Sequence, residues 1–118
     1  MKSKKLIQTP YFRSIKQLQL TAQTFLGQYC MTTKEWEKKL REEGFGHIFT
    51  WADGPLAFYP NHTHPGTTAH IILDGEMTLT SGGQTRTYEP GERCDVPALA
   101  VHSARMGPAG CKYIVGEK

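Results

Sequence analysis

Short runs of strand-forming residues, separated by turn-forming ones, fill residues 46–118, and this pattern limits the fold more than any other feature. The runs are HIFTW, LAFY, TAHIIL, EMTLT, TRTYE, RCDVP, VHSA and CKYIVG, and the breaks between them are rich in Gly, Pro, Asn and Asp. Seven or eight strands at this spacing are typical of an antiparallel sandwich or barrel. The SGGQ break predicts a tight hairpin, because glycine accepts the positive φ that such turns require. We therefore expect an all-β domain.

Residues 1–45 have a different character and are expected to form an N-terminal extension. Thr32 stands three residues before Glu35, which is the capping-box arrangement, and the strong helix formers that follow stop at a glycine. These signals predict a helix over about residues 33–43. Apolar residues also recur at helical steps within residues 12–29, although QLQLTAQTF alternates like a strand, so both interpretations stay open there.

Composition argues against several classes of function. The chain has 118 residues, of which 38% are hydrophobic and 21% charged, so we expect a globular protein. It has no stretch of about 18 consecutive apolar residues, which a membrane span requires. Three cysteines without a CxxC motif indicate reduced thiols and a cytoplasmic location. The basic residues do not cluster on one element with interleaved aromatic residues, which argues against nucleic-acid binding.

Histidines are concentrated in one short segment, NHTHPGTTAHIILDGE. His62, His64 and His70 lie within nine positions, and their even numbering places them on one face if the backbone is extended. Neutral imidazoles bind transition metals at roughly 2.0–2.2 Å, so the H-x-H pair is a candidate grip on a metal ion. A further ligand must come from another part of the chain, and His102 is the candidate.

Two motifs in this region resemble the signatures of the cupin superfamily, which are small β-barrels of the jelly-roll type. The first is H-x-H followed at fixed spacing by a glutamate and a glycine; His62 and His64 fit it, but Thr68 occupies the glutamate position. The stretch YEPGERCDVPALAVHSA, which contains His102, resembles the second motif. The resemblance covers about residues 46–116. It implies a cupin jelly-roll β-barrel or sandwich over residues 46–118, with an N-terminal helical extension.

The chain departs from the family pattern at four positions. Thr68 replaces the glutamate ligand, Leu56 and Leu99 stand where the motifs have glycine, and Met106 stands where an asparagine often occurs. Without the carboxylate, three neutral imidazoles leave the charge of a divalent cation uncompensated. That favours direct binding of an anionic substrate or of hydroxide.

The resemblance implies that His62, His64 and His102 are metal ligands. His70 lies two residues beyond Thr68 on the same strand face. It is either a fourth ligand or a pocket-lining residue that contacts substrate or carries protons. Open coordination positions suit Zn, Fe or Ni, whereas a site poor in carboxylates is less suited to Mn.

The leading hypothesis for function is a metal-dependent cupin enzyme, an oxygenase or an isomerase. It would act on a small organic molecule by dioxygenase-like or Lewis-acid chemistry, with His70 as the candidate catalytic residue. The alternatives are a non-catalytic module that binds a metal or a metabolite, and a structural domain that mainly dimerises. We expect a cytoplasmic homodimer with a small-molecule ligand or substrate, and neither nucleic acid nor membrane as a partner.

Other side chains are expected to line the barrel or to lie at its periphery. Trp51, Phe58, Tyr59 and Tyr113 are candidates for barrel lining. Arg86, Arg93 and Arg105 are expected as solvated rim charges, although one that pointed inward would anchor a carboxylate. Cys94 is expected in the core and His47 at the surface.

Overall fold

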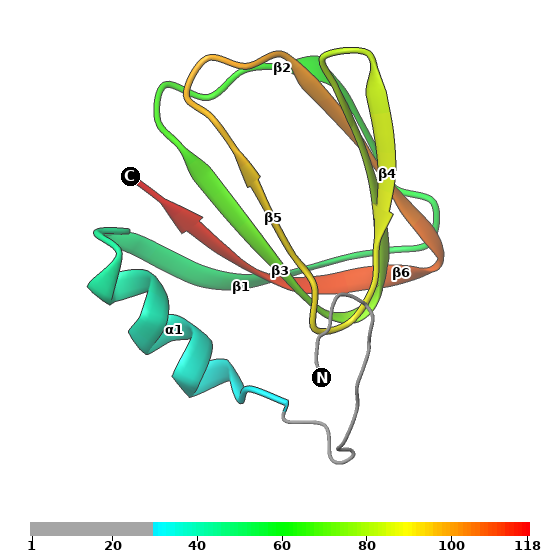
Figure 1. Cartoon of the computed structure of the whole chain (residues 1–118). Coiled ribbons are helices and arrows are strands. Elements are labelled where there is room, and N and C mark those ends of the chain that lie inside the picture. The colour runs from blue at the N-terminus through cyan, green and yellow to red at the C-terminus, as the bar shows by residue number, and fades with distance from the viewer. Residues whose placement is uncertain (1–29) are drawn as a thin grey trace, which may run out of the picture. The chain divides into compact units, whose positions relative to one another are not determined.

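One helix and six antiparallel strands make up the described part of this computed structural model, residues 30–118. In chain order they are α1 Thr33–Glu42, β1 His47–Asp53, β2 Phe58–His62, β3 Thr68–Ser81, β4 Gln84–Tyr88, β5 Arg93–Val96 and β6 His102–Glu117 (Figure 1). The predicted all-β class with a helix ahead of the strands is confirmed. The helical pattern over 12–29 lies outside the described residues, and the domain boundary near residue 45 stays a prediction.

The long strands β3 and β6 run side by side through the whole sheet and give it two halves. The first half of β3 pairs with β5 on one side and with the end of β6 on the other, and the end of β6 in turn pairs with β1. The second half of β3 pairs with β4 and with the start of β6, which pairs with β2. Each half therefore contains four strand segments, and β3 and β6 cross from one half to the other.

The predicted separate strands TAHIIL and EMTLT are one continuous strand, β3, and VHSA and CKYIVG likewise form β6. The glycine-containing breaks between them are bends within strands and not chain reversals. The register of β3 against β6 shifts on both sides of Gly75, which has a φ of 79°. A Cβ atom at Gly75 would collide with the backbone oxygen of Gly110 on β6. The two strands therefore approach closely at the bend.

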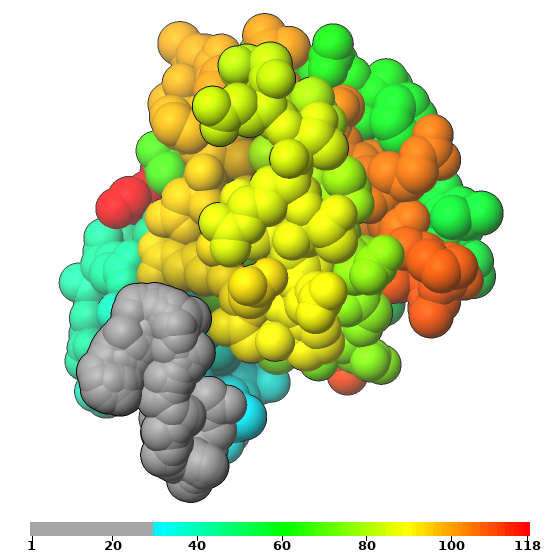
Figure 2. All heavy atoms as spheres, turned by 45° about the vertical axis from the view of Figure 1, so that its right-hand side comes forward, coloured from blue at the N-terminus to red at the C-terminus, as the bar shows by residue number. Residues whose placement is uncertain are grey.

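The hairpin predicted at SGGQ is present between β3 and β4. Ser81 pairs with Gln84, and the two glycines between them both have positive φ, 59° at Gly82 and 79° at Gly83. A two-residue turn with positive φ at both positions matches the right-handed twist of the strands that it joins. Figure 2 shows β4 and the segment after it, in yellow, spread over one face of the molecule.

Helix α1 begins with the predicted capping box. The side chain of Thr32 accepts a hydrogen bond from the Glu35 backbone at 3.1 Å, and Glu35 Oε1 accepts one from the Thr32 backbone at 2.8 Å. The helix packs one face on the outside of the sheet through Leu40, which is fully buried against Phe45, Ile71 and Ile114. No helix within residues 30–118 is long and apolar enough to cross a membrane.

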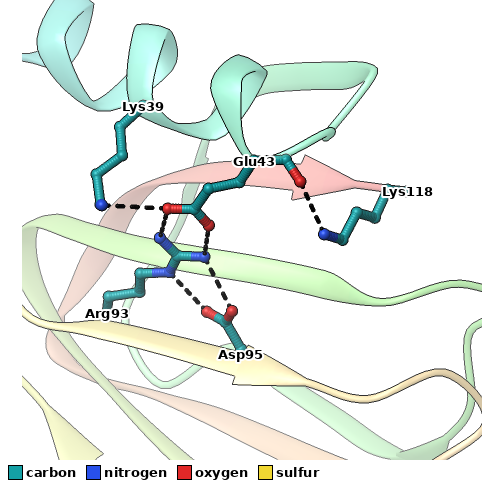
Figure 3. A network of polar contacts seen from close by, with 5 residues as sticks. All are labelled: Lys39, Glu43, Arg93, Asp95 and Lys118. Carbon is teal, nitrogen blue, oxygen red and sulfur yellow. Dashed lines mark hydrogen bonds and ion pairs between the residues drawn. The ribbon is translucent and has the colours of Figure 1, made fainter.

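A charged network fixes the end of α1 to strand β5 (Figure 3). The Arg93 guanidinium donates to both carboxylate oxygens of Glu43, at 2.6 and 3.0 Å, and to both carboxylate oxygens of Asp95, at 2.7 and 2.9 Å. Lys39 lies 3.2 Å from the Glu43 carboxylate, and Lys118 donates to the Glu43 backbone oxygen at 2.9 Å. Arg93 thus joins two elements that are 50 residues apart in sequence.

The inner face of the sheet encloses a second apolar cluster. It contains ten buried residues: Ile72, Met77, Leu79, Cys94, Val96, Ala104, Met106, Cys111, Tyr113 and Val115. Cys94 is therefore a core thiol, as predicted, and burial raises its pKa. The inner cluster is drawn from both halves of the sheet. The cavity described next lies on the same face.

Candidate metal centre

Strands β2 and β6 bring the first and last of the candidate ligands together. His62 ends β2 and is the register partner of His102, which begins β6. His64 follows in the loop before β3, and its backbone oxygen accepts a hydrogen bond from Leu99 at 2.9 Å. That bond ties the H-x-H loop to the segment that leads into His102. Local pairing therefore joins two motifs that are 40 residues apart.

The three imidazoles form a compact group. Their ring centroids are 4.8 Å apart for His62 and His64, 4.2 Å for His62 and His102, and 5.1 Å for His64 and His102. One nitrogen from each ring lies within 4.8 Å of the others, which is compatible with a single metal ion. His102 is only 3% exposed, whereas the other two are half-buried. All three rings line one cavity inside the fold.

Backbone carbonyls set the tautomer of two of these rings. Nδ1 of His62 donates to the oxygen of Pro60 at 2.7 Å, and Nδ1 of His102 donates to the oxygen of Ala100 at 3.0 Å. A carbonyl oxygen only accepts, so each Nδ1 carries a proton, and in the neutral ring Nε2 is the nitrogen that keeps its lone pair. Metal-ligating histidines are typically oriented by such a hydrogen bond from the second ring nitrogen. The donor set therefore fits a transition metal.

Burial lowers the pKa of His64, and the neighbouring His62 and His102 lower it further. Burial also lowers the pKa of His70, to about 4, and His102 and His64 add to this while the Cys94 backbone opposes it. Imidazoles must be unprotonated to bind a metal or to accept a proton. Both rings are therefore neutral at pH 7.

His70 is not part of the three-histidine group. It lies on β3, where its register partners are Cys94 and Val115, and its ring centroid is 6.0 Å from that of Tyr113. Its Nδ1 is buried without a hydrogen-bond partner. Thr68, two residues earlier, is 3% exposed, and its Oγ1 is also buried without a partner. Both side chains line the same cavity as the three histidines.

That cavity has a volume of about 610 Å³. Besides the four histidines and Thr68, its lining consists of Phe49, Trp51, Tyr59, Pro60, Asn61, Met77, Leu79, Ala104, Met106, Tyr113, Val115 and Glu117. Within the described residues the lining includes no lysine or arginine, and Glu117 is its one carboxylate. The size and the largely apolar wall suit a small organic molecule.

The aromatic part of the wall is held by a residue that the sequence did not single out. Asp53 accepts hydrogen bonds from Trp51 Nε1 at 3.0 Å, from the Tyr59 hydroxyl at 2.7 Å and from the Tyr113 hydroxyl at 2.7 Å. Burial raises the pKa of both tyrosines, and the hydrogen bond to Asp53 raises it further. Both tyrosines line the cavity, and their raised pKa makes them poor acids near neutral pH.

Three of the four aromatic residues predicted to line the barrel do so. Phe58 does not: it is 51% exposed and lies under the Arg105 guanidinium, whose carbon is 4.4 Å from the ring centroid. None of the three predicted rim arginines lines the cavity. His47 is at the surface, as predicted, and its Nδ1 lies 2.8 Å from Glu117 Oε1.

Residues 50–115 match the family described as Cupin domain. No curated protein matches the chain. Among solved structures, a cupin superfamily protein from Desulfitobacterium hafniense aligns with a TM-score of 0.55 and 23% identity, over 59% of this chain and 63% of that one. A cupin-2 domain containing protein from Shewanella frigidimarina aligns at 0.53 and 20%, over 59% and 67%.

DMSP lyase DddQ from Ruegeria pomeroyi is also similar, with a TM-score of 0.56 and 24% identity. The alignment covers 60% of this chain but only 36% of the lyase, so more than half of the lyase has no counterpart in this chain. At these identities the solved structures establish a shared fold and no shared activity.

Proposed function

The chain belongs to the cupin family, and from this premise we propose that it is a metal-dependent enzyme that acts on a small organic molecule. The observation that carries the proposal is the orientation of the histidines. Two rings are held with Nδ1 protonated, and one nitrogen of each of the three rings lies within 4.8 Å of the others. Histidines that cluster at a surface by chance are not expected to share the same fixed tautomer.

His62, His64 and His102 would hold the ion, which we expect to be Zn, Fe or Ni, with Mn less suited to a group without a carboxylate ligand. When bound, the metal supplies Lewis-acid or redox chemistry at its open positions. The three rings are neutral ligands, so the cation keeps its attraction for an anionic oxygen or sulfur of a substrate.

His70 would act on the substrate and not on the metal. Its Nδ1 is buried without a partner on the cavity wall, and its low pKa keeps the ring neutral at pH 7. A neutral imidazole in this place can hydrogen-bond a substrate and accept a proton from it. Because the cavity has no cationic side chain among the described residues, a second negative charge on the substrate would find no partner.

The first experiment measures metal content of protein purified without a histidine tag, after incubation with Zn, Fe, Ni or Mn. We expect about one ion per chain, and a large loss of it in His62→Ala and His102→Ala. His47→Ala, which removes an exposed histidine outside the cavity, should retain the metal, and so should His70→Gln. Parent protein that takes up none of the four metals would rule out the proposed ligand group.

A second experiment separates an enzyme from a binding module. Oxygen consumption and product formation are followed with Fe- and Ni-loaded protein over small thiols, diketones, phenols and organic acids, and product formation with the Zn form. Turnover that disappears in His70→Gln, while metal content persists, is the expected result. Metal-loaded protein that binds such compounds without converting any of them would favour a non-catalytic module instead.

A further inference from the structure

The proposed ligand group consists of neutral donors, and the structure places one carboxylate beside it. Glu117 is the carboxylate among the cavity-lining residues, and it comes from the end of β6, the strand that His102 begins. Three imidazoles would leave the full charge of a divalent cation in a largely apolar cavity. A nearby negative charge would lower the free energy of the occupied site.

The position of Glu117 is fixed by its backbone. It pairs with His47 on β1 and with Thr68 on β3. Its backbone oxygen accepts from Gly46 at 3.1 Å, and the next residue, Lys118, donates to the Thr67 oxygen at 3.0 Å. The end of β6 is thus joined to strands on both sides, and Glu117 cannot move far from the cavity.

Thr68 stands directly across from Glu117, and directly opposed residues in a sheet point to the same face. The Thr68 hydroxyl is buried in the cavity without a hydrogen-bond partner. A buried hydroxyl without a hydrogen-bond partner is unfavourable, so the space beside Glu117 is suited to a polar guest and not to an apolar one. Two independent features therefore mark the same corner of the cavity as polar.

We propose that Glu117 is the charge-balancing carboxylate of the metal centre, acting from outside the ligand group. This inference rests on the proposed function. Glu117 lies outside the group of clustered ligand atoms, and its Oε1 is 2.8 Å from His47 Nδ1, so it is assigned a role through charge and not through coordination.

The test compares Glu117→Gln with Glu89→Gln, which removes the same charge from an exposed side chain outside the cavity. Zn²⁺ affinity is measured by competition with a chromophoric chelator, at low and high salt. We expect Glu117→Gln to weaken binding by about five- to tenfold at low salt and less at high salt, because Glu117 is half exposed and screened. Glu89→Gln should bind as the parent does.

The absorption spectrum of the Co²⁺-loaded protein reports the ligand set. It should be the same in the parent and in Glu117→Gln. Equal Zn²⁺ affinities for these two proteins would overturn the inference and leave Glu117 as a strand-end partner of His47. A changed Co²⁺ spectrum would also overturn it, since Glu117 would then be a ligand. A parent protein that binds no metal would instead remove the proposed function itself.

Discussion

Leu99 holds a backbone conformation that residues other than glycine rarely adopt, with a φ of 66°. Leu56, at 59°, does the same. Both stand where the cupin motifs have glycine, the residue that adopts this conformation without a steric cost. Leu99 donates its N–H to His64, and this contact holds the H-x-H loop against the approach to His102. The strain is thus stored beside the candidate ligands.

Substitution of Leu99 by glycine should relieve that strain. The side chain is 69% exposed, so little apolar burial is lost. The left-handed conformation costs a residue with a Cβ roughly 1–2 kcal/mol. Glycine avoids this cost, but its greater freedom in the unfolded chain cancels part of the gain. We expect Leu99→Gly to be about 1 kcal/mol more stable than Leu99→Ala in urea unfolding, and at least as stable as the parent. An alanine variant that matched or exceeded the glycine variant would contradict this account.

At the same scale, the sequence was sufficient to predict the three clustered histidines but not the residues that surround them. The H-x-H spacing and the motif around His102 are local patterns, and each could be read directly. Asp53 and Glu117 could not be, because their roles arise from pairing between distant strands. Glu117 lies 70 positions from its partner His47 and is the register partner of Thr68 only in the folded sheet.

At the scale of elements, the bends in β3 and β6 decide how the two halves of the sheet meet. Sequence patterns predicted chain breaks at these glycines, because a turn and a strand bend both use positive φ. What separates the two cases is whether the partner strand continues alongside. That is a non-local property, and the eight predicted runs became six strands for this reason.

The bend gives a matched pair of glycine substitutions. Gly75 and Gly83 have the same φ of 79°, but a Cβ at Gly75 would meet the backbone of Gly110, whereas one at Gly83 meets nothing within 4 Å. Gly83→Ala should therefore cost only the conformational term, roughly 1–2 kcal/mol. Gly75→Ala must also push two paired strands apart, and we expect a loss of about 3 kcal/mol or more, or no folded protein. Urea unfolding of both variants measures the difference, and equal losses would show that the bend tolerates a side chain.

For the molecule as a whole, two apolar layers form the core, and one of them, together with a charged link, holds the helix on the sheet. One layer fills the inside of the sheet, and the other lies between its outer face and α1. The amphipathic helix could be predicted from its caps and its composition. Its attachment could not, because Arg93 was expected as a rim charge and instead bridges Glu43 and Asp95.

This link makes stability depend on acid. The hydrogen bonds from Arg93 to Glu43 lower the pKa of that carboxyl from 4.5 to about 2, and Lys39 contributes less. Because the pKa is depressed in the folded state, the unfolded chain takes up the proton first as the pH falls. The stabilisation by Glu43 is therefore fully present above about pH 4.5, declines below it, and is lost as the pH falls through about 2.

Glu43→Gln removes the titrating group while keeping the size of the side chain. Free energies of unfolding in urea, measured from pH 7 to pH 2, should fall less steeply with acid for Glu43→Gln than for the parent, and the two curves should converge near pH 2. Glu89→Gln serves as the control, because the exposed Glu89 side chain makes no contact with α1. Its free energy of unfolding should follow that of the parent closely across this pH range. Parallel curves for Glu43→Gln and the parent would mean that the Arg93 link contributes nothing that depends on charge, and that α1 is held by its apolar face alone.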